Sequence, residues 1–388
     1  MSISLVAAVQ GAALLVLISR LLPGRRRRPP VAPGSAASGS ISVVLTTLDE
    51  AHRVGRCLDG LMAQGPEVGE ILVVDSRSSD GTREIIAEAA ALDSRVRLID
   101  DGPLPAGWVG KVWALECGLR EARGSWVLGV DADTVPRPGL AGGVVAAAEE
   151  AGYDVLSLAP RFAGQTAAER WLQPALLSTL VYRVGAVGET KADTDPMRVM
   201  ANGQCFLARR EVLLREGGYE PARASFCDDV TLARHLARRG VRVGFMDGSR
   251  LFDVHAYSSA SEAWREWGRS LDLKDGTTPR RQAADVVSLL LVMGLPVPLL
   301  IHLAWATMRG QPLTAAQAAL LVVNASLFGI RIAMNVALAR SYEKRGITFW
   351  LSPLADPLAA LRILISSLRR PRQWRGRLYV SLPVADER

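Results

Sequence analysis

The chain contains 388 residues, of which 49% are hydrophobic, and carries a formal net charge of +7 with a mean hydropathy of +0.16. Its four cysteines lie far apart with no C-x-x-C spacing, which excludes a disulfide framework and a cysteine zinc site and fits free thiols in a reducing compartment. The positive charge does not predict a nucleic-acid-binding protein. The arginines are grouped beside apolar stretches, where anionic lipid headgroups and the positive-inside rule account for them.

An apolar run near the N-terminus, residues 2–22, has the length of roughly 20 residues that a helix needs to cross a bilayer core. Arg25 to Arg28 follow it directly. A cleaved signal peptide carries its charge before the apolar run, so we expect residues 1–24 to be an uncleaved transmembrane anchor that leaves the bulk of the chain in the cytoplasm. The alternative for the four arginines is a solvated or nucleic-acid-binding patch. Residues 25–40 change from arginine to proline, alanine, glycine and serine, which predicts a linker.

Strands and helices alternate after this linker. Helical spacing begins near residues 54 and 79, and four short apolar segments predict strands at residues 41–45, 70–74, 96–99 and 125–130. The alternation is typical of right-handed βαβ units, so we expect an α/β domain with a mostly parallel sheet over residues 41–280. Ligands bind beyond the carboxyl ends of the strands in such sheets.

Acidic residues follow the first two predicted strands. Asp75 ends the second strand, where its carboxylate can accept hydrogen bonds from a base or a ribose. Asp80, in the turn that follows, is interpreted mainly as a cap of the next helix. Asp49 and Glu50 close the first strand, either as acids that favour a helix N-terminus or as nucleotide contacts, and the two roles are compatible.

Lys111 and the triplet Asp131-Ala132-Asp133 come next along the chain. Lys111 follows a glycine-rich loop and begins a helix, where it can counter phosphate charge or remain an exposed lysine. The triplet follows the fourth strand directly, and two carboxylates one residue apart can converge on one cation. Mg²⁺ and Mn²⁺ prefer such hard oxygen ligands and bridge a diphosphate. Two solvated loop aspartates are the alternative, but the position after a strand of a parallel sheet favours a metal site.

Asp228 and Asp229 begin a later helix. Two adjacent carboxylates at that position are typical of a cap, but a transfer to a hydroxyl group also needs a base with a suitable pKa. His255 lies just beyond a strand-like segment. It is interpreted as a packed side chain in preference to a third metal ligand.

Residues 262–269 place two tryptophans and two arginines on about two helical turns. One interpretation is a segment that closes over a diphosphate, with Arg269 on the phosphates and Trp267 as a wall. The competing interpretation is an interfacial amphipathic helix, and the two can coexist at a membrane surface.

Two long apolar runs near the C-terminus, residues 283–308 and 313–339, are each long enough to span a membrane. Arg331 in the second run is costly at mid-bilayer, so we expect it to face protein or to snorkel. Residues 347–368 are apolar but interrupted by prolines and charges, which favours re-entrant or interfacial half-helices, with a third full span as the alternative. We therefore assign residues 281–388 to transmembrane or interfacial helices and a basic tail.

Taken in order, these pieces resemble the family 2 glycosyltransferases of the GT-A fold, from about residue 41 to residue 272. The resemblance depends on four motifs: LTTLDEA, VVDSRSSDGT, DADT and CDDVTLA. Four narrower features resemble the branch that glycosylates carotenoids, and are also similar to the hopanoid-associated and ceramide-type enzymes: GWVGKVWAL, NGQCFLARREV, YSSASEAWREWGRSL and WRGRLY. The resemblance implies a Rossmann-like GT-A catalytic domain between the N-terminal anchor and the C-terminal membrane helices.

The resemblance also implies roles for individual residues. Those that would contact the nucleoside are Asp49, Glu50 and Asp75. Lys111 would lie near the donor phosphates, the Asp131 and Asp133 carboxylates would hold Mn²⁺ or Mg²⁺, and Asp229, with Asp228 beside it, would be the catalytic base. The family's Gln-x-x-Arg-Trp motif is absent, with residues 262–269 in its place, which favours a single transfer over processive synthesis. Asp49 stands where asparagine is usual, which leaves the donor base open.

The sequence thus predicts an inverting glycosyltransferase that moves a sugar from a nucleotide-diphosphate sugar to a hydroxyl of a membrane lipid. A UDP-sugar is the expected donor and a carotenoid the expected lipid. We expect a multi-pass plasma-membrane protein with a cytoplasmic catalytic domain and no nucleic-acid partner. Two alternatives stay open: another acceptor, either polyprenyl phosphate or a polysaccharide, or a catalytically degenerate membrane scaffold, against which the intact set of acids argues.

Overall fold

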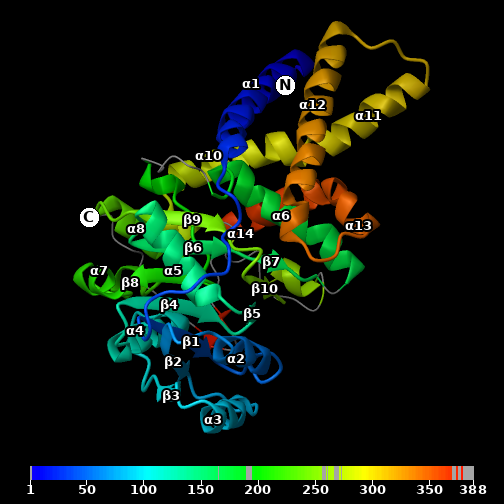
Figure 1. Ribbon diagram of the computed structural model, residues 1–388. Coiled ribbons are helices and arrows are strands. Elements are labelled where there is room, and N and C mark those ends of the chain that lie inside the picture. The colour runs from blue at the N-terminus through cyan, green and yellow to red at the C-terminus, as the bar shows by residue number, and fades with distance from the viewer. Residues whose placement is uncertain are drawn as a thin grey trace. The chain divides into compact units, whose positions relative to one another are not determined.

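The computed structural model describes residues 2–164, 166–188, 195–255, 259, 261–265, 271, 273–368, 373–374 and 377–378. The chain divides into two compact units (Figure 1). The sheet unit comprises Arg28–Phe162, Val187–Ala256 and Pro371–Arg388, and the helical unit comprises Met1–Arg27, Ala163–Ala186 and Tyr257–Arg370. The domain boundaries expected from the sequence stay a prediction. Ala163–Ala186, inside the predicted domain of residues 41–280, belongs to the helical unit.

The sheet unit is built on a seven-stranded sheet. Its strands are β1 (Ile41–Thr47), β2 (Val68–Asp75), β3 (Val96–Asp100), β4 (Trp126–Asp131), β6 (Val155–Ala159), β8 (Phe206–Arg209) and β9 (Val243–Asp247). They follow the order β3-β2-β1-β4-β8-β6-β9. All pairs are parallel except the two made by β8, which runs antiparallel to β4 and β6. The mostly parallel sheet and its four predicted strands are confirmed.

Helices cover this sheet, and a second, smaller sheet lies in the same unit. The helices are α2 (Val54–Met62), α3 (Thr82–Leu92), α4 (Gly110–Glu121), α5 (Leu140–Ala151), α7 (Arg210–Arg215) and α8 (Asp228–Arg238). The smaller sheet has the order β5-β10-β7, with β5 at Thr134–Pro136, β10 at Phe252–Val254 and β7 at Arg161–Phe162. The helices expected near residues 54, 79, 111 and 228 are therefore present.

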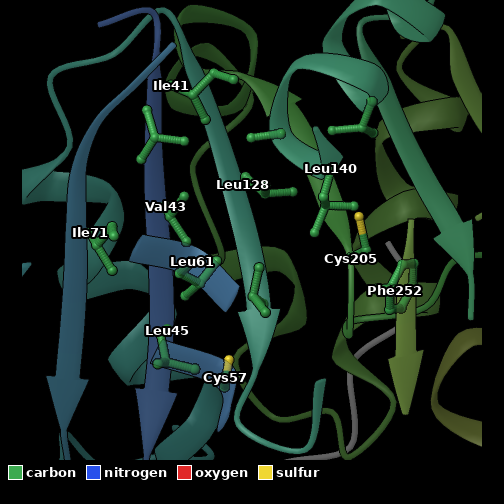
Figure 2. Close-up of a cluster of buried hydrophobic side chains, with 14 of the residues drawn as sticks. Ile41, Val43, Leu45, Cys57, Leu61, Ile71, Leu128, Leu140, Cys205 and Phe252 are labelled. Atoms are coloured by element: carbon green, nitrogen blue, oxygen red, sulfur yellow. The ribbon is translucent and has the colours of Figure 1, made fainter. Parts of the chain in front are cut away.

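Side chains of the central strands alternate between two apolar layers. Val43 and Leu45 of β1 pack in one layer with Leu61 of α2 and Leu140 of α5 (Figure 2). Val44 points the other way, into a layer that α4 and α8 complete. Successive strand residues face opposite sides of a sheet, and here helices bury both sides. The strands are therefore continuous apolar runs, and the polar residues at their ends stand out.

The four cysteines of the chain are free thiols, and three of them are buried. Cys57 and Cys205 lie in the apolar layer of Figure 2. The expected absence of a disulfide framework is consistent with these positions.

Residues 29–40, whose composition predicts a linker, are packed along α5. The Val31 N–H donates to the Asp247 carbonyl at 2.8 Å, and the Gly34 N–H donates to the Gly139 carbonyl at 3.1 Å. Glycines in α5 allow this close approach. A Cβ at Gly142 would lie 2.4 Å from the Gly34 carbonyl oxygen, so any other residue there would displace the segment.

The helical unit contains the apolar helices. They are α1 (Ile3–Leu21), α6 (Ala167–Val184), α10 (Pro279–Leu289), α11 (Pro296–Met308), α12 (Ala315–Leu338), α13 (Ile347–Trp350) and α14 (Asp356–Leu368). Three described segments are long and apolar enough to cross a membrane: Ile3–Arg26, Pro279–Met308 and Ala315–Ser341. They coincide with the three runs predicted to span. Helix α12 packs against both α1 and α11 (Figure 1).

One charged side chain inside the helical unit, Arg331, is paired with an acid and with two polar neighbours. Arg331 of α12 is 2% exposed. Its Nε donates to Asp356 Oδ1 at 3.0 Å and to Oδ2 at 2.9 Å, and its guanidinium also donates to Asn335 and Ser352. The prediction that Arg331 faces protein is confirmed. The segment of residues 347–368 is broken into α13, a 3₁₀ turn (Ser352–Ala355) and α14, and none of the three spanning candidates lies in it.

Candidate active site

The strand order of the sheet changes direction at β1, which makes β1 the topological switch point. Strands β2 and β3 follow on one side of β1, and β4 lies on the other. In open parallel sheets the ligand crevice forms beyond the carboxyl ends of the strands at such a switch point. Asp131 ends β4 opposite Thr46 of β1, and Asp75 ends β2 opposite Thr47. Both predicted acidic clusters therefore lie along this edge.

Asp75 is fully buried and accepts hydrogen bonds from four protein donors. Its Oδ1 accepts from Thr47 Oγ1 at 2.9 Å and Ser78 Oγ at 2.5 Å, and its Oδ2 accepts from the Ser78 N–H and from Arg83 Nη1, each at 3.0 Å. A carboxylate has about four lone-pair positions, and these bonds use four. Asp75 thus ties the ends of β1 and β2 together. Its contact with a nucleoside stays a prediction and would require the exchange of one of these bonds.

Asp49 and Glu50, which follow β1, are held by the loop after β2. Asp49 has a left-handed backbone with φ 54°, a conformation that aspartate tolerates better than most residues. Its N–H donates to Ser78 Oγ at 2.8 Å, and its Oδ1 accepts from the Ser79 N–H at 2.9 Å. Glu50 is buried and forms an ion pair with Arg53. Asp49 is exposed at the sheet edge, whereas Glu50 is already engaged within the protein.

Asp80 lies in the turn that precedes α3. Its Oδ1 accepts from the Thr82 N–H at 3.1 Å and its Oδ2 accepts from the Ala51 N–H at 3.0 Å. These bonds satisfy backbone donors at the start of one helix and in the neighbouring loop. The structural role expected of Asp80 is thus observed, although the residue at the N-cap position of α3 is Gly81.

Lys111, in the first turn of α4, forms an ion pair with Asp131. Its Nζ lies 2.8 Å from Asp131 Oδ1 and 3.0 Å from Oδ2. Burial lowers the pKa of Lys111, but the negative charges of Asp131, Asp228 and Asp229 outweigh it and raise the pKa above its ordinary value. The ammonium group is therefore charged at neutral pH and sits among carboxylates.

Asp133, two residues beyond Asp131, accepts hydrogen bonds from Gln204. The Gln204 Nε2 lies 3.2 Å from Asp133 Oδ1 and 3.1 Å from Oδ2. His255 is close in the backbone, since its N–H donates to the Asp133 carbonyl at 3.1 Å. Among the described residues no group of three or more His, Cys, Asp or Glu side chains is arranged to hold a metal, so His255 does not complete a three-ligand set with the triplet.

Asp228 and Asp229 occupy the first turn of α8, as expected. The Gly203 N–H donates to Asp229 Oδ2 at 2.8 Å. A small pocket beside the pair is lined by both acids, by Gly203 and by apolar side chains that include Phe206 and Tyr219. Asp228 is 8% exposed and Asp229 is half-buried. The Asp229 carboxylate is thus fixed by a backbone donor beside a partly apolar space.

Three carboxylates of this cluster have a pKa above the ordinary value, because they are buried and lie near other acids. Burial and the charge of Asp131 raise the pKa of Asp133 to about 6. Burial and the charge of Asp228 raise the pKa of Asp229 to about 6 against the opposing effect of Lys111, and burial also raises the pKa of Asp228. Carboxylates that repel one another in a buried cleft are typical of functional sites. A further positive charge would stabilise this group.

Asp131 and Asp133 suit a divalent cation. They supply two hard oxygen ligands at the end of β4, and a site with one or two carboxylates plus substrate phosphates is common for Mg²⁺-like ions. Lys111 holds one of these carboxylates by an ion pair that a cation can replace. The donor chemistry and the excess of negative charge therefore fit a divalent metal.

Two predicted donor contacts lie outside the described residues, and one residue of the site was not predicted from the sequence. Trp267 and Arg269 lie outside the described residues, so their assignment stays a prediction. Gln204, which contacts Asp133, was not predicted as a site residue. Gln204 lies in the motif NGQCFLARREV, and nothing in the sequence shows that this segment lies beside the Asp131-Ala132-Asp133 triplet in space.

Comparisons with known proteins agree with this architecture. Residues 42–215 match the model of the family described as glycosyl transferase family 2. Two curated relatives are the succinoglycan biosynthesis protein ExoO of Rhizobium meliloti (31% identical over 117 residues, 30% of this chain) and the glucosyl-3-phosphoglycerate synthase of Mycolicibacterium paratuberculosis (34% over 106 residues, 26% of this chain). Each match spans 31% of the relative's own length.

One solved structure is similar over nearly the whole chain. It is the mannosyltransferase PcManGT from Pyrobaculum calidifontis, solved in complex with GDP-Man and Mn²⁺. It has a TM-score of 0.55 and 21% sequence identity, and the match covers 95% of this chain and 99% of that one. The similarity shows the fold, so the sheet unit has the GT-A architecture that the sequence predicted.

Proposed function

We propose that this protein is a metal-dependent, inverting glycosyltransferase that moves a sugar from a nucleotide-diphosphate sugar to a hydroxyl group of a membrane lipid. The observation that carries the proposal is the cluster of four carboxylates and one lysine at the switch point of a family 2 domain. Asp131 and Asp133 belong to the end of β4, and Asp228 and Asp229 to the start of α8.

Asp229 is the proposed base. Its pKa of about 6 lets it stay ionised at neutral pH and still accept a proton from an acceptor hydroxyl, as a general base requires. The Gly203 N–H holds its Oδ2 and so fixes the direction in which the carboxylate points. Asp228 contributes by its charge, which raises the pKa of its neighbour.

The donor diphosphate is proposed to lie between the triplet and Lys111. Asp131 and Asp133 would hold the cation, Mn²⁺ or Mg²⁺, which when bound would neutralise charge that develops on the leaving diphosphate. Lys111, released from Asp131, would pair with the phosphates. Asp49, Glu50 and Asp75 are the proposed nucleoside contacts, and of these Asp49 has the most exposed side chain. Trp267 and Arg269 remain proposed contacts to the donor.

The lipid acceptor is supported by the three helices that can cross a membrane. A catalytic domain tethered to such helices works at a membrane surface, where lipid acceptors are concentrated. We propose a hydroxylated carotenoid as the first acceptor to test, because of the motifs shared with that branch. We propose the plasma membrane as the location of the protein and a cytoplasmic catalytic domain; the arginines after the first apolar run support this orientation through the positive-inside rule.

The test is a transfer assay on the full chain with Mn²⁺, UDP- and GDP-sugars, and three acceptors: a hydroxylated carotenoid, polyprenyl phosphate and a polysaccharide. Mass spectrometry of the products identifies the acceptor. We expect a carotenoid glycoside from the wild type and a loss of about 10²- to 10⁴-fold in Asp229→Asn, as for removal of a general base. Nucleotide-diphosphate binding should be unchanged in this variant.

The control is Asp59→Asn, which removes an exposed aspartate of α2 in the same unit and should leave turnover unchanged. Normal turnover in Asp229→Asn would disprove the assignment of the base. Glycosylated polyprenyl phosphate or polysaccharide would replace the carotenoid as acceptor. A wild-type chain that binds neither Mn²⁺ nor a nucleotide diphosphate would instead be a scaffold with a degenerate transferase domain.

A further inference from the structure

A short loop, Asn202-Gly203-Gln204, contacts carboxylates from two different elements of the site. The Gln204 amide donates to Asp133, which follows β4, and the Gly203 N–H donates to Asp229 of α8. This loop leads directly into β8. Because β8 is antiparallel to β4, with Phe206 opposite Gly129, the residues that precede β8 lie beside the residues that follow β4.

The orientation of the Gln204 side chain is set by its two neighbours. An ionised carboxylate can only accept hydrogen bonds, so the amide nitrogen must face Asp133. The amide oxygen then accepts from Asn202 Nδ2 at 3.0 Å. Asn202 is fixed in turn, because its Oδ1 accepts from the Gln204 N–H at 3.1 Å and its own N–H donates to Ser157 Oγ at 2.7 Å.

Gly203 keeps the space between the acids open. A Cβ at this position would lie 3.1 Å from Lys111 Nζ and 3.8 Å from both Asp131 Oδ2 and Asp229 Cβ. The loop backbone therefore passes between the triplet and the acid pair of α8. A shift of the loop would move the hydrogen-bond partners of Asp133 and Asp229 together.

We propose that Gln204 is a positioning residue of the metal site, whose side-chain amide, locked by Asn202, sets the direction in which the Asp133 carboxylate faces the cation. The inference deepens the proposed function and rests on it. A donor that fixes a carboxylate ligand reduces its freedom before the metal binds, and the loss of such a donor typically weakens metal binding by about 10- to 100-fold. Gln204 therefore acts through Asp133 and needs no contact with the substrate.

The test measures Mn²⁺ binding to the full chain in detergent by titration calorimetry, with UDP or GDP present, whichever the wild type binds. In Gln204→Met the side-chain length is kept and the donor is removed. We expect its Mn²⁺ dissociation constant to rise about 10- to 100-fold. Its unfolding temperature should stay close to that of the wild type, because Gln204 is half-buried and the loop keeps its backbone bonds.

Gln64→Met is the matched control in the same unit. Gln64 is 5% exposed and its amide bonds the carbonyls of Gly60 and Arg137 and the N–H of Ala141. Its loss should lower the unfolding temperature and leave Mn²⁺ affinity within about twofold, since none of these partners belongs to the metal site. Mn²⁺ affinity thus separates a positioning role from a structural one.

Two outcomes overturn the inference alone: wild-type Mn²⁺ affinity in Gln204→Met, or an equal loss of affinity in Gln64→Met. In both cases the wild type still binds Mn²⁺, and the proposed function is unaffected. A wild type that binds no Mn²⁺ with either nucleotide overturns the proposed function and the inference together.

Discussion

Asp356 in the helical unit meets Arg331 through two hydrogen bonds, whereas the ammonium group of Lys111 in the sheet unit is surrounded by four carboxylates. The first cluster contains one acid and one guanidinium, whose other two nitrogens donate to Asn335 and Ser352. The second contains four acids and one ammonium group in direct contact with one of them.

The comparison teaches how to separate a structural charge from a functional one. Two buried charges that pair with each other need no ligand. Removal of one is costly, because the other charge is then buried without a partner. Acids in excess raise one another's pKa, which costs stability in the absence of a ligand and creates affinity for a cation. By this criterion the acid cluster of the sheet unit is the candidate functional site, and the ion pair of the helical unit is structural.

Asp133→Asn should show the largest effect. Loss of a metal carboxylate should lower transfer by about 10³- to 10⁴-fold, or about 4 to 5 kcal/mol of activation free energy. The metal-free protein should be as stable as the wild type or more stable, because a buried charge beside Asp131 is removed. The measurements are turnover with Mn²⁺ and, separately, thermal unfolding of the metal-free protein in EDTA. A drop of several degrees in the unfolding temperature would identify Asp133 as structural.

Arg331→Met, in contrast, should lower the stability of the protein. It leaves Asp356 buried without its partner, so we expect a loss of about 3 kcal/mol in the free energy of unfolding. The double variant Arg331→Met/Asp356→Leu removes both charges and should recover part of this loss, because Asn335 and Ser352 still hydrogen-bond each other. Unfolding in detergent micelles measures both. If the double variant is the sum of the two single variants, the pair is not coupled.

The contrast also explains which features the sequence could predict. Strands β1 to β4 are apolar runs bounded by turn residues, and the helices that cover both faces leave polar residues at the strand ends. The positions of Asp75 and Asp131 at carboxyl ends follow from that pattern alone. The same local logic identified Asp80 as a cap and placed Lys111 at the start of a helix.

Contacts between distant segments could not be predicted in this way. Gln204 reaches Asp133 because β8 runs antiparallel to β4, and a four-residue strand in a mostly parallel sheet gives no local signal of its direction. Arg331 and Asp356 lie 25 residues apart, and their pairing was not predicted from the sequence. The saturation of Asp75 by Thr47, Ser78 and Arg83 also depends on strand pairing.

The acidic limb of the pH profile of kcat/KM should show the effect of Asp228 on the pKa of Asp229. If Asp229 is the base, transfer requires its ionised form, so kcat/KM should fall about tenfold per pH unit below an apparent pKa of about 6. Mn²⁺ and donor must be saturating at each pH, so that metal release is not measured instead. In Asp228→Asn the limb should move to lower pH, because the charge of Asp228 raises the pKa of Asp229. An unmoved limb would mean that another group titrates.

Gln10→Leu should have the smallest effect, and it extends the comparison to uncharged pairs. Gln10 of α1 and Asn324 of α12 are fully buried and exchange hydrogen bonds, Nε2 to Oδ1 at 3.1 Å and Nδ2 to Oε1 at 3.0 Å. Asn324 keeps a bond to the Leu320 carbonyl when its partner is lost. We therefore expect a cost of about 0.6 to 1.7 kcal/mol, the range for polar pairs between membrane helices. Unfolding in the detergent used for Arg331→Met gives the measurement. A cost equal to that of Arg331→Met would show that burial, and not charge, determines how strongly paired polar groups hold the helical unit together.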